Sequence, residues 1–182
     1  MKSMNLFHAI KQDKAPEVLK LLVEISKGDF VKYEYNNEIG YLEVDRVLYG
    51  PVHYPAVYTD VPGTWNVHDG DPLDAVLYTT GNIIPGAVAH GRVVGVMGME
   101  DNGEFDDKII CVNKKDPRWD YVNDISDMPK HELKDLQTFM ETYKYAQTGP
   151  GTVKITGFKG KEDAYKLIAE SMKAYEEKFK QS

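Results

Sequence analysis

The sequence predicts a mainly β fold of the α+β class, in which two helices near the C-terminus cover a small barrel of strands. Three observations support this class. Short β-branched and aromatic runs, separated by turn residues, fill the chain from Val18 to Tyr121. Beyond that region the hydrophobic period becomes helical. Glycines interrupt the strand region, as they do where a small barrel bends its strands, at Gly81, Gly86, Gly91, Gly95 and Gly98.

Five segments are predicted as strands because they are short, rich in Val, Ile and aromatic residues, and bounded by turn residues. They are residues 30–37, 41–49, 73–80, 91–99 and 108–114. An earlier segment, EVLKLLVEI from Glu17 to Ile25, suits either a helix or a buried strand, because so short a run does not separate the two periods.

Two helices are predicted in the last third of the chain. The first has one apolar face, with Asp127 available as its N-cap before Pro129; the face consists of Leu133, Leu136, Met140 and Tyr143. The second repeats apolar residues at intervals of three and four: Ala164, Leu167, Ile168, Met172, Tyr175 and Phe179. The expected architecture is an OB-type five-stranded barrel with two C-terminal helices packed outside.

Length and composition indicate a single domain spanning residues 1–182. Of these residues, 42% are hydrophobic, enough for a core without disulfides or structural metals. The only cysteine, Cys111, leaves no disulfide framework and favours a reducing compartment. No segment resembles a signal peptide or a membrane span. We therefore expect a cytoplasmic protein without a membrane partner.

The stretch HDGDPLDAVLY crowds Asp69, Asp71 and Asp74 into one bend that leads into a strand. Two ionised carboxylates about 4 Å apart repel by roughly 4 kcal/mol at an effective dielectric near 20, so a cation is expected there. A helix-loop-helix calcium site is excluded, because glycine at position six and glutamate at position twelve are both missing. A solvated acidic turn is the alternative for this cluster alone.

A second acidic cluster, EDNGEFDDK, favours a metal site over that alternative. Its Asn102-Gly103 pair predicts a hairpin turn with Asp101 and Asp106 on opposite arms. Two aspartate clusters at strand ends would together bind hard cations, with oxygen ligands favouring Mg²⁺, or Mn²⁺ as a substitute. The five histidines are scattered, and they offer no competing zinc site.

Basic residues follow on two neighbouring strands. Alternation places Lys32 and Glu34 on one face of the first strand. Arg46 stands among apolar residues of the next strand and needs an anionic partner. The alternative, a structural ion pair with Asp45 or Glu43, is disfavoured because adjacent strand residues point to opposite faces. The net charge of −7 argues against nucleic acid as a partner, and an anionic ligand would need metal ions or local cations.

The motif DGDPLD resembles the signature of the soluble inorganic pyrophosphatases of the first family, which are built on an OB-type barrel. The resemblance covers nearly the whole chain, and it implies that residues 17–25 form a strand. Further motifs match in the family's order. They are Glu24 of LVEIS, Lys32 and Glu34 of KYE, the VDR of Val44 to Arg46, the segment with Tyr54, Pro55 and Tyr58, the hairpin with Asp101, Asp106 and Lys108, and the pair Tyr143 and Lys144.

This resemblance implies specific roles for the matched residues. The metal ligands would be Asp69, Asp74, Asp101, Asp106 and Glu34, with Glu24 in support. The phosphate-binding residues would be Lys32, Arg46, Tyr58, Lys108, Tyr143 and Lys144, and the catalytic group comprises Asp71 as general base with Lys32, Arg46 and Tyr143. When fully ionised, the six acids with these roles other than Glu24 carry a charge of −6, and the four cations carry +4. The formal charge of −2 that remains would repel an anion, so divalent ions would be needed to bind one.

The sequence departs from the family pattern around HYPAVYT, where His53, Val57 and Thr59 replace phenylalanine, asparagine and glycine. Val57 in particular would remove a polar group near the expected phosphate site. Thr152 stands where tryptophan is common, and Asn102 where glutamate is frequent. The predicted metal ligands are all retained, which favours a working enzyme.

The predicted function is metal-dependent hydrolysis of inorganic pyrophosphate to two orthophosphates, by water activated between two metal ions. One alternative is hydrolysis of another phosphoanhydride, such as a short polyphosphate. Another is a non-catalytic OB-type binding module, which would need a basic aromatic face. The resemblance further implies a symmetric homo-oligomer, with a hexamer favoured.

Overall fold

Five strands close into a barrel in the computed structural model, which describes residues 5–179. Neighbouring strands follow the order β1-β4-β5-β8-β6, and a β1–β6 pairing closes the ring. Only β5 and β8 pair in parallel. The barrel strands are β1 (Val18–Ile25), β4 (Val57–Asn66), β5 (Asp71–Tyr78), β6 (Val88–Asp101) and β8 (Lys108–Asn113). The predicted barrel and the strand at residues 17–25 are confirmed.

The remaining strands lie outside the five-stranded ring. A separate two-stranded sheet pairs β2 (Val31–Asn36) with β3 (Tyr41–Val47). Both β7 (Glu104–Phe105) and β9 (Val153–Gly160) pair with β6. The helical elements are α1 (Leu6–Ala9), η1 (Pro117–Trp119), η2 (Ile125–Asp127), α2 (Lys130–Thr142), α3 (Tyr145–Thr148) and α4 (Lys161–Phe179).

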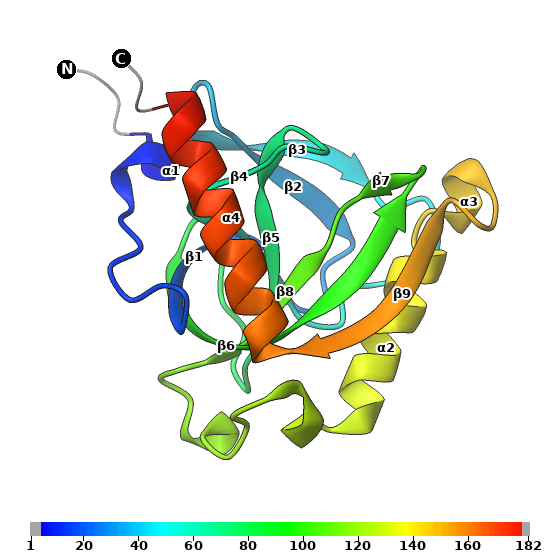
Figure 1. The fold of residues 1–182 in the computed structure, drawn as a ribbon. Helices are drawn as coiled ribbons and strands as arrows, with labels where there is room; N and C mark the ends of the chain where they lie inside the picture. The colour runs from blue at the N-terminus through cyan, green and yellow to red at the C-terminus, as the bar shows by residue number, and fades with distance from the viewer. Residues whose placement is uncertain (1–4, 180–182) are drawn as a thin grey trace.

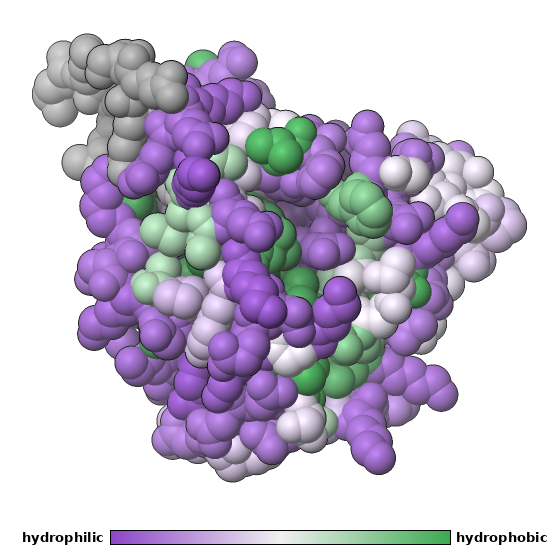
Figure 2. Space-filling model, in the orientation of Figure 1, coloured by the Kyte–Doolittle hydropathy of each residue, from purple (hydrophilic) through white to green (hydrophobic). Residues whose placement is uncertain are grey.

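Most buried apolar side chains of the barrel strands belong to two clusters, as the period of two requires, and Leu22 of β1 joins a third with Phe7 and Tyr175. On β5, Ala75 and Leu77 join Ala164 and Ile168 of α4, whereas Val76 and Tyr78 belong to the cluster that includes α2. Figure 1 shows α4 lying across the barrel strands and α2 packed beside β9. The surface on the α4 side is mostly hydrophilic (Figure 2). In the described part of the chain, no helix combines the length and apolar character needed to cross a bilayer.

Both predicted C-terminal helices are present, but their surroundings differ from the prediction in two ways. The strand β9 lies between them and was not predicted, because its sequence VKITGFKG mixes glycine and lysine with few apolar residues. Asp127 is not the N-cap of α2. Its carboxylate accepts hydrogen bonds from the amides of Asn123 and Asp124, and Pro129 occupies the cap position.

The strand β4 was also missing from the sequence prediction. Pro62 and Gly63 interrupt its run, and proline within a run argues against a strand. The structure accommodates them at an irregularity, since regular pairing with β5 lapses between Val61 and Asn66. The part of β4 before this lapse carries Tyr58 and Asp60 to one face of the sheet, beside β5.

Candidate active site

A pocket of about 550 Å³ opens on the α2 face of the barrel, at the ends of β1, β4, β5 and β8. All thirteen side chains that the sequence singled out line this one pocket. They comprise Glu24, Lys32, Glu34, Arg46, Tyr58, Asp69, Asp71, Asp74, Asp101, Asp106, Lys108, Tyr143 and Lys144. The sequence motifs, which span more than a hundred residues, therefore converge in space.

The acidic bend between β4 and β5 is a tight turn organised by its own side chains. Gly70 has φ of 79°, a conformation that glycine adopts without steric cost. The amide of Asp71 donates to Asp69 Oδ1 at 3.0 Å, and Asn66 Nδ2 donates to Asp69 Oδ2 at 2.9 Å. This turn holds Asp69 in place and leaves the Asp71 side chain exposed at the mouth of the pocket.

The second acidic cluster is the predicted hairpin. Asn102 and Gly103 both have positive φ, 52° and 87°, which matches the twist of the flanking strands. Asp101 ends β6, and Asp106 follows β7 on the returning arm. The prediction that the two aspartates stand on opposite arms is confirmed.

Each of the four cations that line the pocket is paired with a carboxylate. Lys108, only 2% exposed, contacts both Asp74 and Asp106, and Lys144 contacts Asp101. Tyr58 donates to Asp74 Oδ2 at 2.7 Å. Metal ions and an anionic substrate would replace these ion pairs. The carboxylates would then bind metal ions, and the cationic side chains would bind phosphate oxygens.

The sheet of β2 and β3 supplies a further cationic group, and here one sequence argument is wrong. Asp45 is paired with Arg46, and its Oδ2 also lies 3.2 Å from Lys32 Nζ. Asp45 is the extra residue of a β-bulge, since Lys32 pairs with Arg46 while Tyr33 pairs with Val44. A bulge breaks the strict alternation of side chains, so two consecutive residues reach the same side.

A second bulge aims Glu24 into the pocket. On β1, Val23 pairs with Thr59 and Ile25 with Tyr58, which leaves Glu24 as the extra residue. The Glu24 side chain is buried and accepts a hydrogen bond of 2.6 Å from the amide of Tyr35. Burial, followed by the charge of Asp74, raises the pKa of Glu24 to about 8.

Burial dominates the electrostatics of the other pocket acids as well. It raises the pKa of Asp106 to about 7, although the charge of Lys108 lowers that pKa. Burial and then the charges of Asp69 and Asp74 also raise the pKa of Asp71. The Tyr58 phenol has a pKa well above its usual value for the same reasons, burial and then Asp74, so it remains a hydrogen-bond donor.

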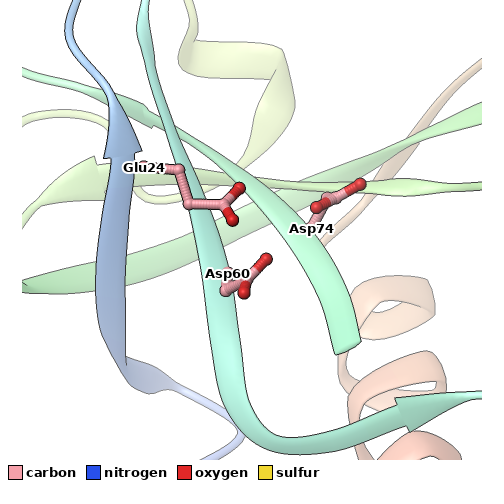
Figure 3. Close-up of side chains that lie close together, drawn as sticks. All are labelled: Glu24, Asp60 and Asp74. Carbon is pink, nitrogen blue, oxygen red and sulfur yellow. The ribbon is translucent and has the colours of Figure 1, made fainter. Parts of the chain in front are cut away.

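One buried carboxylate of the pocket, Asp60, was not predicted from the sequence. Asp60 of β4 is buried, pairs across the strands with Asp74, and lines the pocket. Nothing in the sequence pointed to it, because a lone aspartate before Val-Pro-Gly is typical of a turn. Figure 3 shows Glu24, Asp60 and Asp74 close together, and one carboxylate oxygen of each lies within 4.8 Å of the others.

The replacements at Val57 and Thr59 do not alter the pocket as expected. Val57 is fully buried in the apolar cluster of the α4 face, and neither residue lines the pocket. The Thr59 hydroxyl donates to the backbone oxygen of Ala75 at 2.9 Å. The expectation that Val57 removes a polar group near a phosphate site is therefore wrong, since alternation along β4 turns the residue away from the pocket.

The donor set of the pocket fits hard divalent cations. Ten carboxylates and four cationic side chains line it, a formal excess of six negative charges when all are ionised. The ligand atoms of Glu24, Asp60 and Asp74 lie within 4.8 Å of one another. Oxygen donors in such numbers are those that Mg²⁺ and Mn²⁺ prefer.

Comparisons with known proteins relate the chain to one family. A family model described as inorganic pyrophosphatase matches residues 21–176. The inorganic pyrophosphatase of Helicobacter pylori is 44% identical over 160 residues, which cover 87% of this chain and 91% of the relative. That of Thermus thermophilus is 39% identical over 164 residues, which cover 90% and 93%.

Solved structures show the same likeness in three dimensions. The crystal structure of the Thermus thermophilus inorganic pyrophosphatase superposes with a TM-score of 0.89 at 38% identity, covering 95% of this chain and 99% of that one. The Helicobacter pylori enzyme gives a TM-score of 0.86 at 41% identity, with coverages of 92% and 98%. The chain therefore belongs to the inorganic pyrophosphatase family.

Proposed function

We propose that the protein hydrolyses inorganic pyrophosphate to two orthophosphates, by direct attack of water on phosphorus without a covalent enzyme intermediate. In the overall reaction the water oxygen forms a new P–O bond, the bridging P–O bond breaks, and the second phosphate leaves. The main observation in support of this proposal is that ten carboxylates and four cationic side chains line the same pocket. One set suits metal ions and the other suits phosphate oxygens.

Two bound Mg²⁺ ions, or Mn²⁺ in their place, would lower the pKa of a shared water and neutralise the phosphate charge. The carboxylates of Asp69, Asp74, Asp101, Asp106 and Glu34 would hold the metal ions, with Glu24 in support. Asp71 would accept the proton of the attacking water. Its raised pKa suits that role, because a general base works best with a pKa nearer the operating pH.

The cationic and phenolic side chains would hold the phosphate groups. Lys32, Arg46, Lys108 and Lys144 carry the positive charge of the pocket, and Tyr58 and Tyr143 contribute hydroxyls. The buried Arg46 Nε has no hydrogen-bond partner in the structure, which leaves a donor free for an incoming anion. Such fixed donors stabilise negative charge as it develops on the leaving phosphate.

The structure offers no reason to prefer a different phosphoanhydride. That alternative was based on Val57, whose side chain lies in the core and not in the pocket. The homo-oligomer, the hexamer and the cytoplasmic location stay predictions from the resemblance.

The test is phosphate release from pyrophosphate with Mg²⁺ and with a chelator, for wild type, Asp71→Asn and the control Asp163→Asn. Asp163 lies on α4 outside the pocket. We expect Mg²⁺-dependent turnover in wild type and control. Asp71→Asn should lose about 10²- to 10⁴-fold in kcat, the usual contribution of a general base. Wild type without activity at any Mg²⁺ or Mn²⁺ concentration would contradict the proposed function, and an active Asp71→Asn would contradict the role of Asp71.

A further inference from the structure

Glu24, Asp60 and Asp74 form a cluster of three carboxylates, and Asp60 is the one whose side chain has no partner among residues 5–179. Glu24 accepts a hydrogen bond from the Tyr35 amide, and Asp74 accepts from Tyr58 and pairs with Lys108. Asp60 is 6% exposed, and its carboxylate makes no hydrogen bond or ion pair with any residue between positions 5 and 179. A buried, unpaired carboxylate is strongly unfavourable, so an additional charged or protonated species is required beside it.

The strands direct Asp60 towards the other two acids. Asp60 and Asp74 are cross-strand partners on β4 and β5, which places them on the same face of the sheet. The bulge of β1 brings Glu24 to that face from the other side of β4. Their ligand atoms lie within 4.8 Å of one another, and Figure 3 shows the three carboxylates close together.

Asp60 is buried among groups of its own charge. The residue is 6% exposed, and its carboxylate has the carboxylates of Glu24 and Asp74 as close neighbours. Lys108 contacts Asp74 of this group, but it is shared with Asp106 and makes no ion pair with Asp60. A divalent cation would supply the missing charge to all three carboxylates at once.

We propose that Asp60 is a metal ligand, and that it binds a divalent cation together with Asp74 and Glu24 at the buried end of the pocket. This inference rests on the proposed function, because it assigns a further ligand to the metal set of the same site. Three carboxylates and no nitrogen or sulfur donor favour Mg²⁺ or Mn²⁺. All three ligands belong to the protein, so this cation binds before pyrophosphate arrives.

The test is binding of Mn²⁺ to the full-length protein without pyrophosphate, by calorimetry and by the proton relaxation of water bound to Mn²⁺. The variants are Asp60→Asn, which preserves shape, and Glu38→Gln, which removes the same charge from another position in the pocket lining. We expect Asp60→Asn to weaken one Mn²⁺ site by on the order of tenfold or more. It should also raise the water relaxivity at that site, because water replaces the lost carboxylate. Glu38→Gln should do neither.

The proposal would be overturned if Asp60→Asn bound Mn²⁺ with the same affinity, stoichiometry and water relaxivity as wild type. Asp60 would then be a buried neutral carboxyl. An equal loss of affinity in Glu38→Gln would also overturn it, since the effect would be one of net charge. Thermal unfolding in chelator checks the fold, and Asp60→Asn should be at least as stable as wild type because a like charge is removed. Asp60→Ser serves as a second variant with the same expected results.

The pyrophosphatase assay of the same wild-type preparation separates this proposal from the proposed function. An inactive wild type whose Mn²⁺ site is lost in Asp60→Asn would reject the function and keep Asp60 as a ligand. An active wild type with unchanged Mn²⁺ binding in Asp60→Asn would reject the role of Asp60 alone.

Discussion

At the scale of single residues, Arg46 shows how the pocket is prepared for an anion. One nitrogen of its guanidinium contacts Asp45, whereas the buried Nε has no hydrogen-bond partner among residues 5–179. A buried donor that stays unsatisfied costs free energy, so this arrangement is favourable only when a ligand accepts from it. Lysine would keep the charge but has no group corresponding to Nε, which makes Arg46→Lys a selective probe.

We predict that Arg46→Lys lowers kcat/KM for pyrophosphate by roughly 10- to 150-fold, the equivalent of about 1.5–3 kcal/mol for a hydrogen bond to a charged group. Steady-state kinetics at saturating Mg²⁺ measures this change. Arg118→Lys is the matched control, because Arg118 has a side chain 71% exposed and lies outside the pocket. Wild-type kcat/KM in Arg46→Lys would show that the Nε donor does not serve the substrate.

The thirteen site residues could be predicted from sequence because each belongs to a motif that is recognisable locally. Asp60 could not, since it is a single aspartate in a strand that proline and glycine disguise. The role given to Val57 failed for a related reason. Position within a motif does not specify which face of the strand a side chain occupies, and Val57 faces the core.

At the scale of elements, two β-bulges made the direction of some side chains unpredictable from the alternation of residues along a strand. Strict alternation separates neighbouring side chains, yet the bulges at Glu24 and Asp45 turn both carboxylates towards the groups that they serve. The order of the barrel strands is equally non-local, because β5 pairs with β8 across a sequence gap that contains β6. Apolar runs predicted where most strands lie, and the resemblance supplied their arrangement.

The close approach of β6 and β9 gives an element-scale prediction. A Cβ atom added at Gly95 would lie 2.6 Å from the backbone oxygen of Lys159 and 2.9 Å from Ile125 Cβ. We expect Gly95→Ala to lower the free energy of unfolding by about 1–3 kcal/mol, as overpacking of a core does. Urea denaturation measures it.

Gly81→Ala is the control for this experiment, because a Cβ at that position meets no atom within 4 Å. It should leave the stability unchanged or raise it by about 0.4–1 kcal/mol through the unfolded chain. Equal stability of the Gly95 and Gly81 variants would mean that β9 can shift away from β6 without loss.

At the scale of the whole molecule, the acidic site makes the stability of the protein depend on pH and metal. The pKa of Glu24 rises from 4.5 to about 8 on folding, and that of Asp106 from 3.8 to about 7. An acid with a raised pKa holds its proton more tightly in the folded state. Its favourable contribution is therefore complete below the unfolded pKa and is lost as the pH rises through the folded pKa. Bound cations oppose this loss, because they stabilise the charged carboxylates.

We therefore predict that in chelator the melting temperature of wild type falls, relative to that of Glu24→Gln, as the pH rises from about 4.5 to about 8. The comparison isolates the site, since His8 and His90 have pKa values lowered by burial, act in the opposite sense and are present in both proteins. Calorimetric scans at several pH values, with chelator and with Mg²⁺, measure the difference. Mg²⁺ should raise the melting temperature of wild type most at the alkaline end of this window, where the carboxylates lose their protons. If the difference in melting temperature between the two proteins stayed constant from pH 4.5 to 8, Glu24 would have the same charge in the folded and unfolded states throughout that range.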